Sequence, residues 1–288
     1  MARRFASRFV AGETIDDAVG AVRALNARKI SASLDLLGES VTNAAEARAT
    51  ADHYVTLLDR IATEGLDSNV SVKLTAMGQD ISDTLCIENI TRVLERARTH
   101  QTFVRLDMEG SAYTERTLQL FEEHLFPRFP EEVGIVLQSY LRRTAADVSN
   151  ALDIQCRVRL CKGAYKEPAT VAFPDKRDVD ASYVTEMKRL MLRGKYPGVA
   201  THDEAIIAEA KRYATEQGIA RDRFEFQMLY GVRRDLQDQL VREGYGMRVY
   251  VPYGTQWYPY LMRRLAERPA NVAFMTGSIM KETLASRG

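Results

Sequence analysis

The amino-acid sequence predicts an α/β protein folded as a single, distorted (βα)8 barrel of the TIM type. Eight short apolar runs alternate with segments of helical periodicity, as parallel strands joined by crossover helices require. The length of 288 residues suits such a barrel, which typically needs about 250. The alternative is an open doubly wound sheet, but no G-x-G-x-x-G or G-x-x-x-x-G-K motif follows the first run.

The expected strands are short runs of apolar side chains separated by helical segments. They cover residues 31–38, 69–78, 102–110, 132–141, 156–165, 196–203, 224–231 and 246–252. The last run, GMRVYVP, alternates large apolar residues with polar or small ones, and Pro252 and Gly254 then end it. Because the C-terminal ends of barrel strands carry the active site, polar residues at those ends are the candidates for function.

Amphipathic helices are expected before the first strand and between the strands. The clearest stretches cover residues 15–27, 42–63, 86–99 and 113–124. The basic N-terminus should form a short helix that docks on the barrel, because Phe5, Phe9 and Val10 fall on one face. Residues 1–30 are therefore expected to be a helical extension of a single domain that spans residues 1–288.

A last helix should follow the eighth strand. Thr255 or Gln256 can cap its start. Pro259 suits the first turn, where a missing N–H costs nothing, and Pro269 ends the helix. The one long connection without helical periodicity, residues 163–180, is expected to fold over the site.

Composition and charge indicate a globular protein that works inside the cell. Hydrophobic residues make up 45% and charged residues 27%, with no low-complexity tract. A formal net charge of +1 provides no broad basic field for nucleic acid. No run of ~18 apolar residues is present to span a bilayer. The three cysteines and four histidines show no C-x-x-C or H-x-x-x-H spacing, so we expect a reducing, cytoplasmic location and no metal.

Two adjacent arginines on the last helix, Arg263 and Arg264, and Tyr250 at the end of the last strand form one candidate site. Arginine offers a planar fork that grips a carboxylate with two hydrogen bonds, and tyrosine supplies an apolar wall with a polar tip. A small carboxylate would suit this set. The alternative is a solvated helix face, because Arg263 and Glu267 are spaced i,i+4.

Polar residues gather at or just past the predicted strand ends. They are Asp35, Glu39, Lys73, Asp107, Glu109, Gln138, Arg159, Lys162, Tyr165, Thr201, His202, Asp203, Gln227 and Tyr250. Lys73 and Arg159 are the most informative, because a cation within a strand-like run needs a partner or a ligand. A purely structural role stays open for these residues. Lys73, for example, can pair with Asp35 or Asp107 across the barrel mouth. His202 alone would more often be a structural hydrogen-bond donor than a catalyst.

The candidate site is rich in cations and amides, and it contains no convincing nucleophile–base pair around a serine or cysteine. Such a cavity suits anions, or an electron-rich cofactor that gains negative charge. A barrel aldolase in which Lys73 or Lys162 forms a Schiff base is a second hypothesis. A barrel that binds a carboxylated ligand without catalysis is a third.

Several motifs together resemble the proline dehydrogenase family, over residues 4–274. They are SLDLLGE, SVKLTAMG, VRLDMEG, RLCKGAYKEP, VATHD, FEFQMLYG and the YLMRRLAERPAN segment that follows Tyr250. The chain length and the GAYKEP form make the sequence most similar to the compact monofunctional bacterial type, which is related to the proline dehydrogenase domain of bifunctional proline utilisation proteins.

The resemblance implies a distorted (βα)8 barrel that holds FAD without a covalent bond. It implies oxidation of L-proline to Δ1-pyrroline-5-carboxylate by hydride transfer to flavin N5, the first step of proline catabolism to glutamate. A membrane quinone would accept the electrons. A cytoplasmic location is expected, with peripheral contact at the inner face of the membrane left open, and no oligomeric state is implied.

The resemblance also assigns a substrate site. The matching residues are Lys73, Tyr165, Leu229, Tyr250, Arg263 and Arg264. The paired arginines would clamp the substrate carboxylate, and Lys73 would add a third cation. The two tyrosines and the leucine would wall in the pyrrolidine ring. Glu39 resembles the family's gate residue, which pairs with the first arginine when the site closes.

The residues that match the family's cofactor site are Met108, Gln138, Arg159, Lys162, Gly163, Ala164, Thr201, His202 and Gln227. Among them, Arg159 would lie by the flavin N5 edge and Gln138 by the polar edge of the ring. The catalytic group would be Asp107, Arg159 and Tyr250. One departure is Asp203, where family members often have asparagine, and this leaves the cofactor contacts at that point open.

Overall fold

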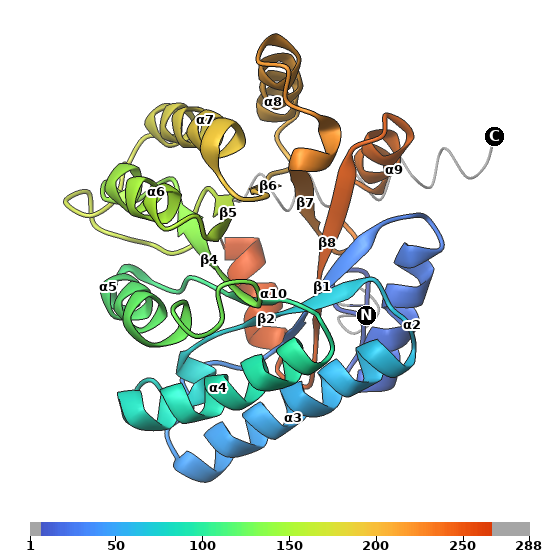
Figure 1. Cartoon of the computed structure of the whole chain (residues 1–288), viewed down its shortest axis with the longest axis vertical. Helices are drawn as coiled ribbons and strands as arrows, with labels where there is room; N and C mark the ends of the chain where they lie inside the picture. Colours follow the sequence, from blue (N-terminus) through green and yellow to red (C-terminus); the bar gives the residue numbers. More distant parts are fainter. Residues whose placement is uncertain (1–6, 267–288) are drawn as a thin grey trace.

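The computed structural model describes residues 7–266, with side chains to residue 262, and shows a closed barrel of eight parallel strands in sequence order (Figure 1). β8 pairs in parallel with β1, and Ser33 lies opposite Tyr250 where these two strands close the barrel. The helices form a ring around the strands. The predicted (βα)8 barrel is confirmed.

The strands lie within or beside the eight predicted runs, and most are shorter than predicted. They are β1 (Ser31–Leu36), β2 (Ser68–Val72), β3 (Val104–Leu106), β4 (Val133–Gln138), β5 (Arg157–Cys161), β6 (Gly198–Ala200), β7 (Glu225–Leu229) and β8 (Gly246–Tyr253). The chain leaves the sheet early because it turns into the loops at the mouth. After β2, for example, residues 75–77 form a 3₁₀ turn, so Lys73 lies just past the strand rather than within it.

The helices also follow the predicted order. They are α2 (Ile15–Asn26), α3 (Ala44–Thr63), α4 (Asp83–Thr99), α5 (Ser111–Leu120), α6 (Thr144–Asp153), α7 (Lys176–Arg193), α8 (Glu204–Glu216), α9 (Arg234–Arg242) and α10 (Trp257–Ala266). α7 begins within the predicted loop 163–180, which therefore ends at residue 175. Pro269, the predicted stop of the last helix, lies outside the described residues. Within residues 7–266, every helix is too short or too polar to cross a bilayer.

The described part of the N-terminal segment packs against the last helix. Phe9 and Val10 are buried, Phe9 against Leu261 and Val10 against Tyr260. Residues 7–9 form turns rather than a helix. The earlier part of the expected helix, with Phe5, lies outside the described residues.

α10 lies over the C-terminal mouth of the barrel. In Figure 1 it crosses the centre of the helical ring. Tyr260 packs against Leu37, which directly follows β1, and Leu261 belongs to a cluster with Val232, which follows β7. Both contacts are with residues that follow the C-terminal ends of strands, so α10 covers the mouth where the functional residues of such barrels lie.

Tyr54 of α3 ties its helix to the barrel wall. Its side chain is buried, its hydroxyl donates to the carbonyl of Ser71 in β2 at 2.8 Å, and it accepts from the backbone N–H of Leu36 in β1 at 3.1 Å. One hydroxyl thus satisfies two buried backbone groups on neighbouring strands.

We expect Tyr54→Phe to lower the free energy of unfolding by about 1–3 kcal/mol, because it keeps the ring but leaves the buried backbone groups without this partner. Urea denaturation measures the change. The matched control is Tyr113→Phe, which removes a hydroxyl bonded to Asp80 at the exposed surface. Equal effects of the two substitutions would show that Tyr54 does not have this role.

Candidate active site

Three strands bring the predicted catalytic residues together inside the mouth. Asp107 follows β3, Arg159 lies in β5 and Tyr250 lies in β8. Arg159 Nη1 donates to Asp107 Oδ1 at 2.8 Å, and the Tyr250 hydroxyl donates to Asp107 Oδ2 at 2.8 Å. The guanidinium carbon lies 5.4 Å from the centroid of the Tyr250 ring. A single carboxylate therefore aligns a cation and a phenol.

Two serines that the sequence reasoning missed complete the surroundings of Arg159. Its Nη1 donates to Ser71 Oγ at 3.1 Å and its Nη2 to Ser33 Oγ at 3.3 Å, and the two hydroxyls lie 3.0 Å apart. Arg159 is buried, so these acceptors and Asp107 compensate for its lost hydration. Ser33 and Asp35 alternate with apolar residues along β1. This period of two could have indicated that both side chains lie on the same face of the strand.

Gln227 joins Arg159 to a deeper layer of charge. Its carbonyl oxygen accepts from Arg159 Nε, and its amide donates to Glu225 Oε1 at 2.6 Å. Arg248 also donates to Glu225, from Nε at 2.7 Å. Burial would raise the pKa of Glu225, but the ion pair with Arg248 and these hydrogen bonds hold it below its ordinary value. Arg159 can only donate and the Glu225 carboxylate can only accept, so these two neighbours together fix the orientation of the Gln227 amide.

Lys73 pairs with Asp35, one of the two partners that the sequence left open. Its Nζ lies 2.7 and 2.9 Å from the two carboxylate oxygens. Asp35 is fully buried, and burial raises the pKa of its carboxyl group. Burial alone would lower the pKa of Lys73, but Asp35, Asp107 and Glu109 together raise it above its ordinary value. The lysine therefore brings a permanent positive charge to the mouth.

Glu109 is another buried carboxyl group, two residues past Asp107. Thr75 donates to it twice, from Oγ1 to Oε1 at 2.6 Å and from its backbone N–H to Oε2 at 3.3 Å. Burial raises the pKa of Glu109 to about 7, and the bonds from Thr75 and the charge of Lys73 offset this only in part. Glu109 is thus a group that changes charge near neutral pH.

Lys162 and its neighbours form the side of the mouth after β5 and β6. Lys162 Nζ lies 2.5 Å from Asp180 Oδ1 and 2.9 Å from Asp203 Oδ2. Burial would raise the pKa of Asp203, but Lys162 holds it below its ordinary value. Asp203 also accepts from the backbone N–H of Ala205 at the start of α8, and Thr201 Oγ1 accepts from the N–H of Asp203. A charged carboxylate at position 203 thus has a local role that asparagine would fill less well.

His202 has a defined orientation. Its Nε2 accepts a hydrogen bond from the backbone N–H of Leu229 at 3.0 Å. A backbone amide can only donate, so Nε2 carries no proton in this arrangement and Nδ1 is the nitrogen that can donate. The pair links two predicted site residues that are distant in sequence.

Gln138, at the end of β4, has one buried atom without a partner. Its amide nitrogen lies 3.4 Å from the carbonyl oxygens of Met108 and Glu109. Within the part of the chain that the structure describes, its Oε1 is buried and has no hydrogen-bond partner. An unpaired buried acceptor is costly, which marks this position as one where a ligand can supply a donor.

Gly163 begins the loop after β5 in a conformation that requires glycine. Its φ is +109°, and a Cβ at this position would lie 2.2 Å from the Tyr140 ring. Ala164 and Tyr165 follow in the same loop. Glu167 holds the loop against α5, because its Oε1 accepts from the backbone N–H of Ser111 at 2.7 Å.

For the remaining predicted residues, the structure gives the position in the fold but not the predicted side-chain contacts. Glu39 lies in the loop between β1 and α3, and Leu229 ends β7. Arg263 and Arg264 lie in α10, which covers the mouth, but their side chains fall outside what the structure describes. The clamp assigned to them and the ion pair assigned to Glu39 therefore stay predictions.

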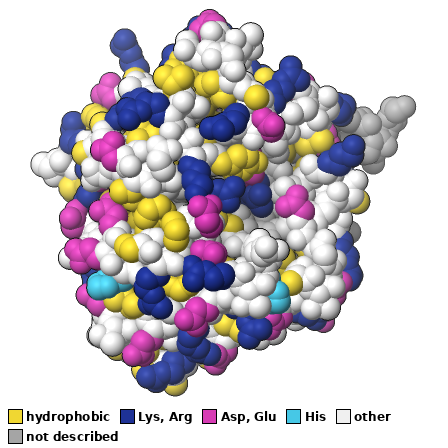
Figure 2. Space-filling view, in the orientation of Figure 1, with side chains coloured by type: hydrophobic (Ala, Val, Ile, Leu, Met, Phe, Trp, Pro, Cys, Tyr) yellow, Lys and Arg dark blue, Asp and Glu magenta, His cyan; other side chains and the backbone are white. Residues whose placement is uncertain are grey.

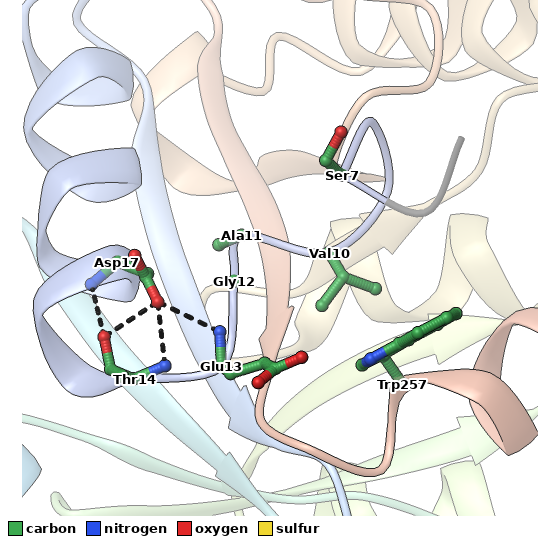
Figure 3. A pocket seen from close by; sticks show the side chains of 8 residues that line it. All are labelled: Ser7, Val10, Ala11, Gly12, Glu13, Thr14, Asp17 and Trp257. Atoms are coloured by element: carbon green, nitrogen blue, oxygen red, sulfur yellow. Dashed lines mark hydrogen bonds between the residues drawn. The ribbon is translucent and has the colours of Figure 1, made fainter. Parts of the chain in front are cut away.

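A groove of about 300 Å³ beside the start of α2 is separate from these residues (Figure 3). It runs from Ser7 to Asp17 and is closed on one side by Trp257. Its polar groups bond one another: the Asp17 carboxylate accepts from the backbone N–H groups of Glu13 and Thr14. None of the site residues predicted above lines it.

The surface carries both signs of charge. Figure 2 shows acidic and basic side chains interspersed over one face, with apolar residues between them. Among residues 7–266, no group of three or more His, Cys, Asp or Glu side chains is arranged to hold a metal ion.

Glu109 generates a pH-dependent prediction. Its pKa is raised from 4.5 to about 7 in the folded protein, so the folded state retains a proton that the unfolded state has lost. Stability should fall as the pH rises through this window, and Glu109→Gln should remove that loss. We expect the variant to gain roughly 2–3 kcal/mol relative to the parent protein between pH 5 and pH 8 in urea denaturation. A difference that stays constant with pH would contradict the assignment.

The chain is similar to known proteins over nearly its whole length. A family model described as proline dehydrogenase matches residues 18–277. Proline dehydrogenase 2 of Bacillus subtilis is 44% identical over 287 residues, which cover 98% of this chain and 94% of the relative. The proline dehydrogenase of Deinococcus radiodurans is 44% identical over 279 residues, covering 96% and 90%.

The fold is also similar to solved structures. A crystal structure of proline utilization A from Bdellovibrio bacteriovorus, inactivated by N-propargylglycine, superposes with a TM-score of 0.85 and 28% identity. The match covers 91% of this chain and 32% of the other, so this chain spans about a third of that larger protein. From the family match and the near full-length relatives, the chain belongs to the proline dehydrogenase family.

Proposed function

We propose that this chain is a proline dehydrogenase that oxidises L-proline to Δ1-pyrroline-5-carboxylate with FAD, the first step of proline catabolism. The observation that carries the proposal is the hydrogen-bonded group of Asp107, Arg159 and Tyr250 beside the Lys73–Asp35 pair, in a chain 44% identical to named proline dehydrogenases over nearly its whole length. A membrane quinone is the proposed electron acceptor, and the proposed location is cytoplasmic with peripheral contact at the inner face of the membrane.

The substrate site would lie between the strand ends and α10. Arg263 and Arg264 would bind the proline carboxylate, since α10 lies over the mouth and guanidinium groups grip carboxylates with two bonds. Lys73 supports this assignment because its charge is held by the surrounding carboxylates. Tyr250 would pack against the ring, with Leu229 and Tyr165 completing the wall.

The residues present fit FAD. Gln138 Oε1 is a buried acceptor that lacks a partner among the described residues, and the flavin edge carries donors. Gly163 lets the loop after β5 pack closely on the Tyr140 ring, and this fixes the course of the loop that would carry the cofactor contacts of Lys162 and Ala164. Lys162 and His202 would contact the ribityl and pyrophosphate groups, as the family resemblance implies. When bound, FAD supplies the hydride acceptor for the reaction.

In the proposed reaction, the protein's own residues position the substrate and supply fixed charges around it. The clamp would turn an encounter between substrate and acceptor into a held pair, which is worth several orders of magnitude in rate. Arg159, held by Asp107, would place a positive charge beside the position where negative charge develops. Asp107 keeps Arg159 and the Tyr250 hydroxyl in place, so neither has to reorient during turnover.

The same geometry argues against the aldolase hypothesis. A Schiff-base lysine must lose its proton to act as a nucleophile. Three carboxylates raise the pKa of Lys73, and Lys162 lies in ion pairs with Asp180 and Asp203. Lys73 is therefore held in the charged, unreactive form, and the amine of Lys162 is engaged by two carboxylates.

We expect the purified protein to be yellow and its flavin absorbance to bleach when L-proline is added without oxygen. An aldolase or a binding scaffold would be colourless, and borohydride with substrate would trap only the aldolase. A protein that binds no flavin, or whose flavin stays oxidised in excess proline, would contradict the proposal.

In the same titration, Arg264→Met should retain FAD and raise the proline concentration needed for half-bleaching by about two orders of magnitude, as expected for a lost bidentate carboxylate contact. Arg212→Met is the matched control, because Arg212 is an exposed residue of α8 that pairs with Glu209 and Glu216. The clamp is misassigned if both variants behave like the parent protein.

A further inference from the structure

The middle of the loop between β1 and α3, residues 37–43, is bonded to Thr75. Ser40 adopts a φ of +56°, in the left-handed region that non-glycine residues rarely occupy. Its backbone N–H donates to Thr75 Oγ1 at 3.0 Å, and the N–H of Val41 donates to the Thr75 carbonyl at 3.3 Å. Backbone strain of this kind persists only where the surroundings maintain it, so Thr75 is the residue that maintains it here.

Thr75 is itself held by Glu109. The hydroxyl that accepts from Ser40 donates its own proton to Glu109 Oε1 at 2.6 Å, and the Thr75 backbone N–H donates to Oε2. A chain of hydrogen bonds therefore runs from Glu109 through Thr75 to Ser40. Each bond polarises the next, and bonds to an ionised carboxylate are about twice as strong as neutral ones.

The charge of Glu109 is set by groups on every side of it. Lys73 after β2 favours the ionised form, and Glu39 in the same β1–α3 loop opposes it. Cys86 of α4 and Tyr113 of α5 also lie close enough to respond to its charge. Burial brings the pKa of this carboxyl group to about 7.

We propose that Glu109 is a positioning residue that acts through Thr75 to hold the loop carrying Glu39, and that it holds the loop more firmly when it is ionised. The proposal rests on the proposed function, since Glu39 is the residue we expect to close the substrate site. Two donors from Thr75 require two acceptor oxygens, which the carboxylate offers and its protonated form offers less well. The loop should therefore be better ordered for substrate above pH 7 than below it.

Residue-resolved hydrogen–deuterium exchange of the full chain tests this hold. In Thr75→Val, which keeps the shape and removes the hydroxyl, the Ser40 amide should exchange at least fivefold faster, while the Val41 amide keeps its carbonyl acceptor and changes less. Thr75→Ser, which keeps the hydroxyl, should restore slow exchange at Ser40. The same substitution at another buried threonine, Thr117→Val in α5, should leave Ser40 unchanged.

The dependence on charge is tested by the same measurement across pH. After correction for the intrinsic exchange rate, protection of the Ser40 amide should rise from pH 6 to pH 8 in the parent protein and stay flat in Glu109→Gln. Equal protection of Ser40 in Thr75→Val and Thr75→Ser, or the same pH profile with and without the Glu109 carboxylate, would overturn the proposal.

Kinetics of the flavin-loaded protein test the link to substrate. Glu109→Gln should raise KM for proline several-fold with little change in kcat at pH 8, and the two proteins should converge at pH 6. An unchanged KM at pH 8 would mean that the loop does not act in substrate binding, and the proposal would fail. If no protein of the series oxidises proline, the proposed function fails instead, while the exchange experiment still decides whether Glu109 holds the loop.

Discussion

Asp107 receives hydrogen bonds from two other strands, and the arrangement of the barrel mouth depends on this one carboxylate. It pairs with Arg159 of β5 and accepts from Tyr250 of β8, with little exposure to water. Breaking a buried ion pair by removing one partner typically costs 3–5 kcal/mol, because an uncompensated charge remains. The network is therefore costly to break, and it fixes a cation and a phenol at one place in the mouth.

The polar interior continues on both sides of this carboxylate. Gln227 connects Arg159 to the Glu225–Arg248 pair deeper in the barrel, and Lys73 pairs with Asp35 beside it. A barrel interior is usually filled with branched apolar side chains. Here charge and hydrogen bonding replace part of that packing, which places several buried titratable groups within reach of a ligand and costs stability that the outer apolar core must supply.

Much of the fold could be predicted from the sequence, because eight short apolar runs separated by helical segments leave few arrangements open to a chain of this length. The strand ends were less predictable. β2 ends at Val72, and the chain then leaves the sheet to place Thr75 in the 3₁₀ turn beside Glu109. No local residue preference in the sequence predicts this early end. The turns at residues 7–9, where the described part of the chain begins, were predicted as helix because the apolar spacing suits both.

The site was predictable where a charged residue interrupts an apolar run, as at Lys73 and Arg159. Which partner each one chooses depends on distances across the barrel, so the Lys73–Asp35 pair was one of two alternatives until the register was known. Ser33 and Ser71 were missed because serine is common in strands. Only the structure shows that both hydroxyls accept hydrogen bonds from Arg159. The roles of the α10 arginines stay predictions, since their side chains lie outside the described residues.

The account depends on Asp107 and Arg159 acting as one unit, and a double-mutant cycle tests this most directly. The rate constant of proline-dependent flavin bleaching would be measured for Asp107→Asn, Arg159→Met and the double variant. The account predicts that the double variant is about as slow as the slower single variant, because each substitution already disrupts the same unit. Losses that multiply in the double variant would show that the two residues act independently, and would contradict it.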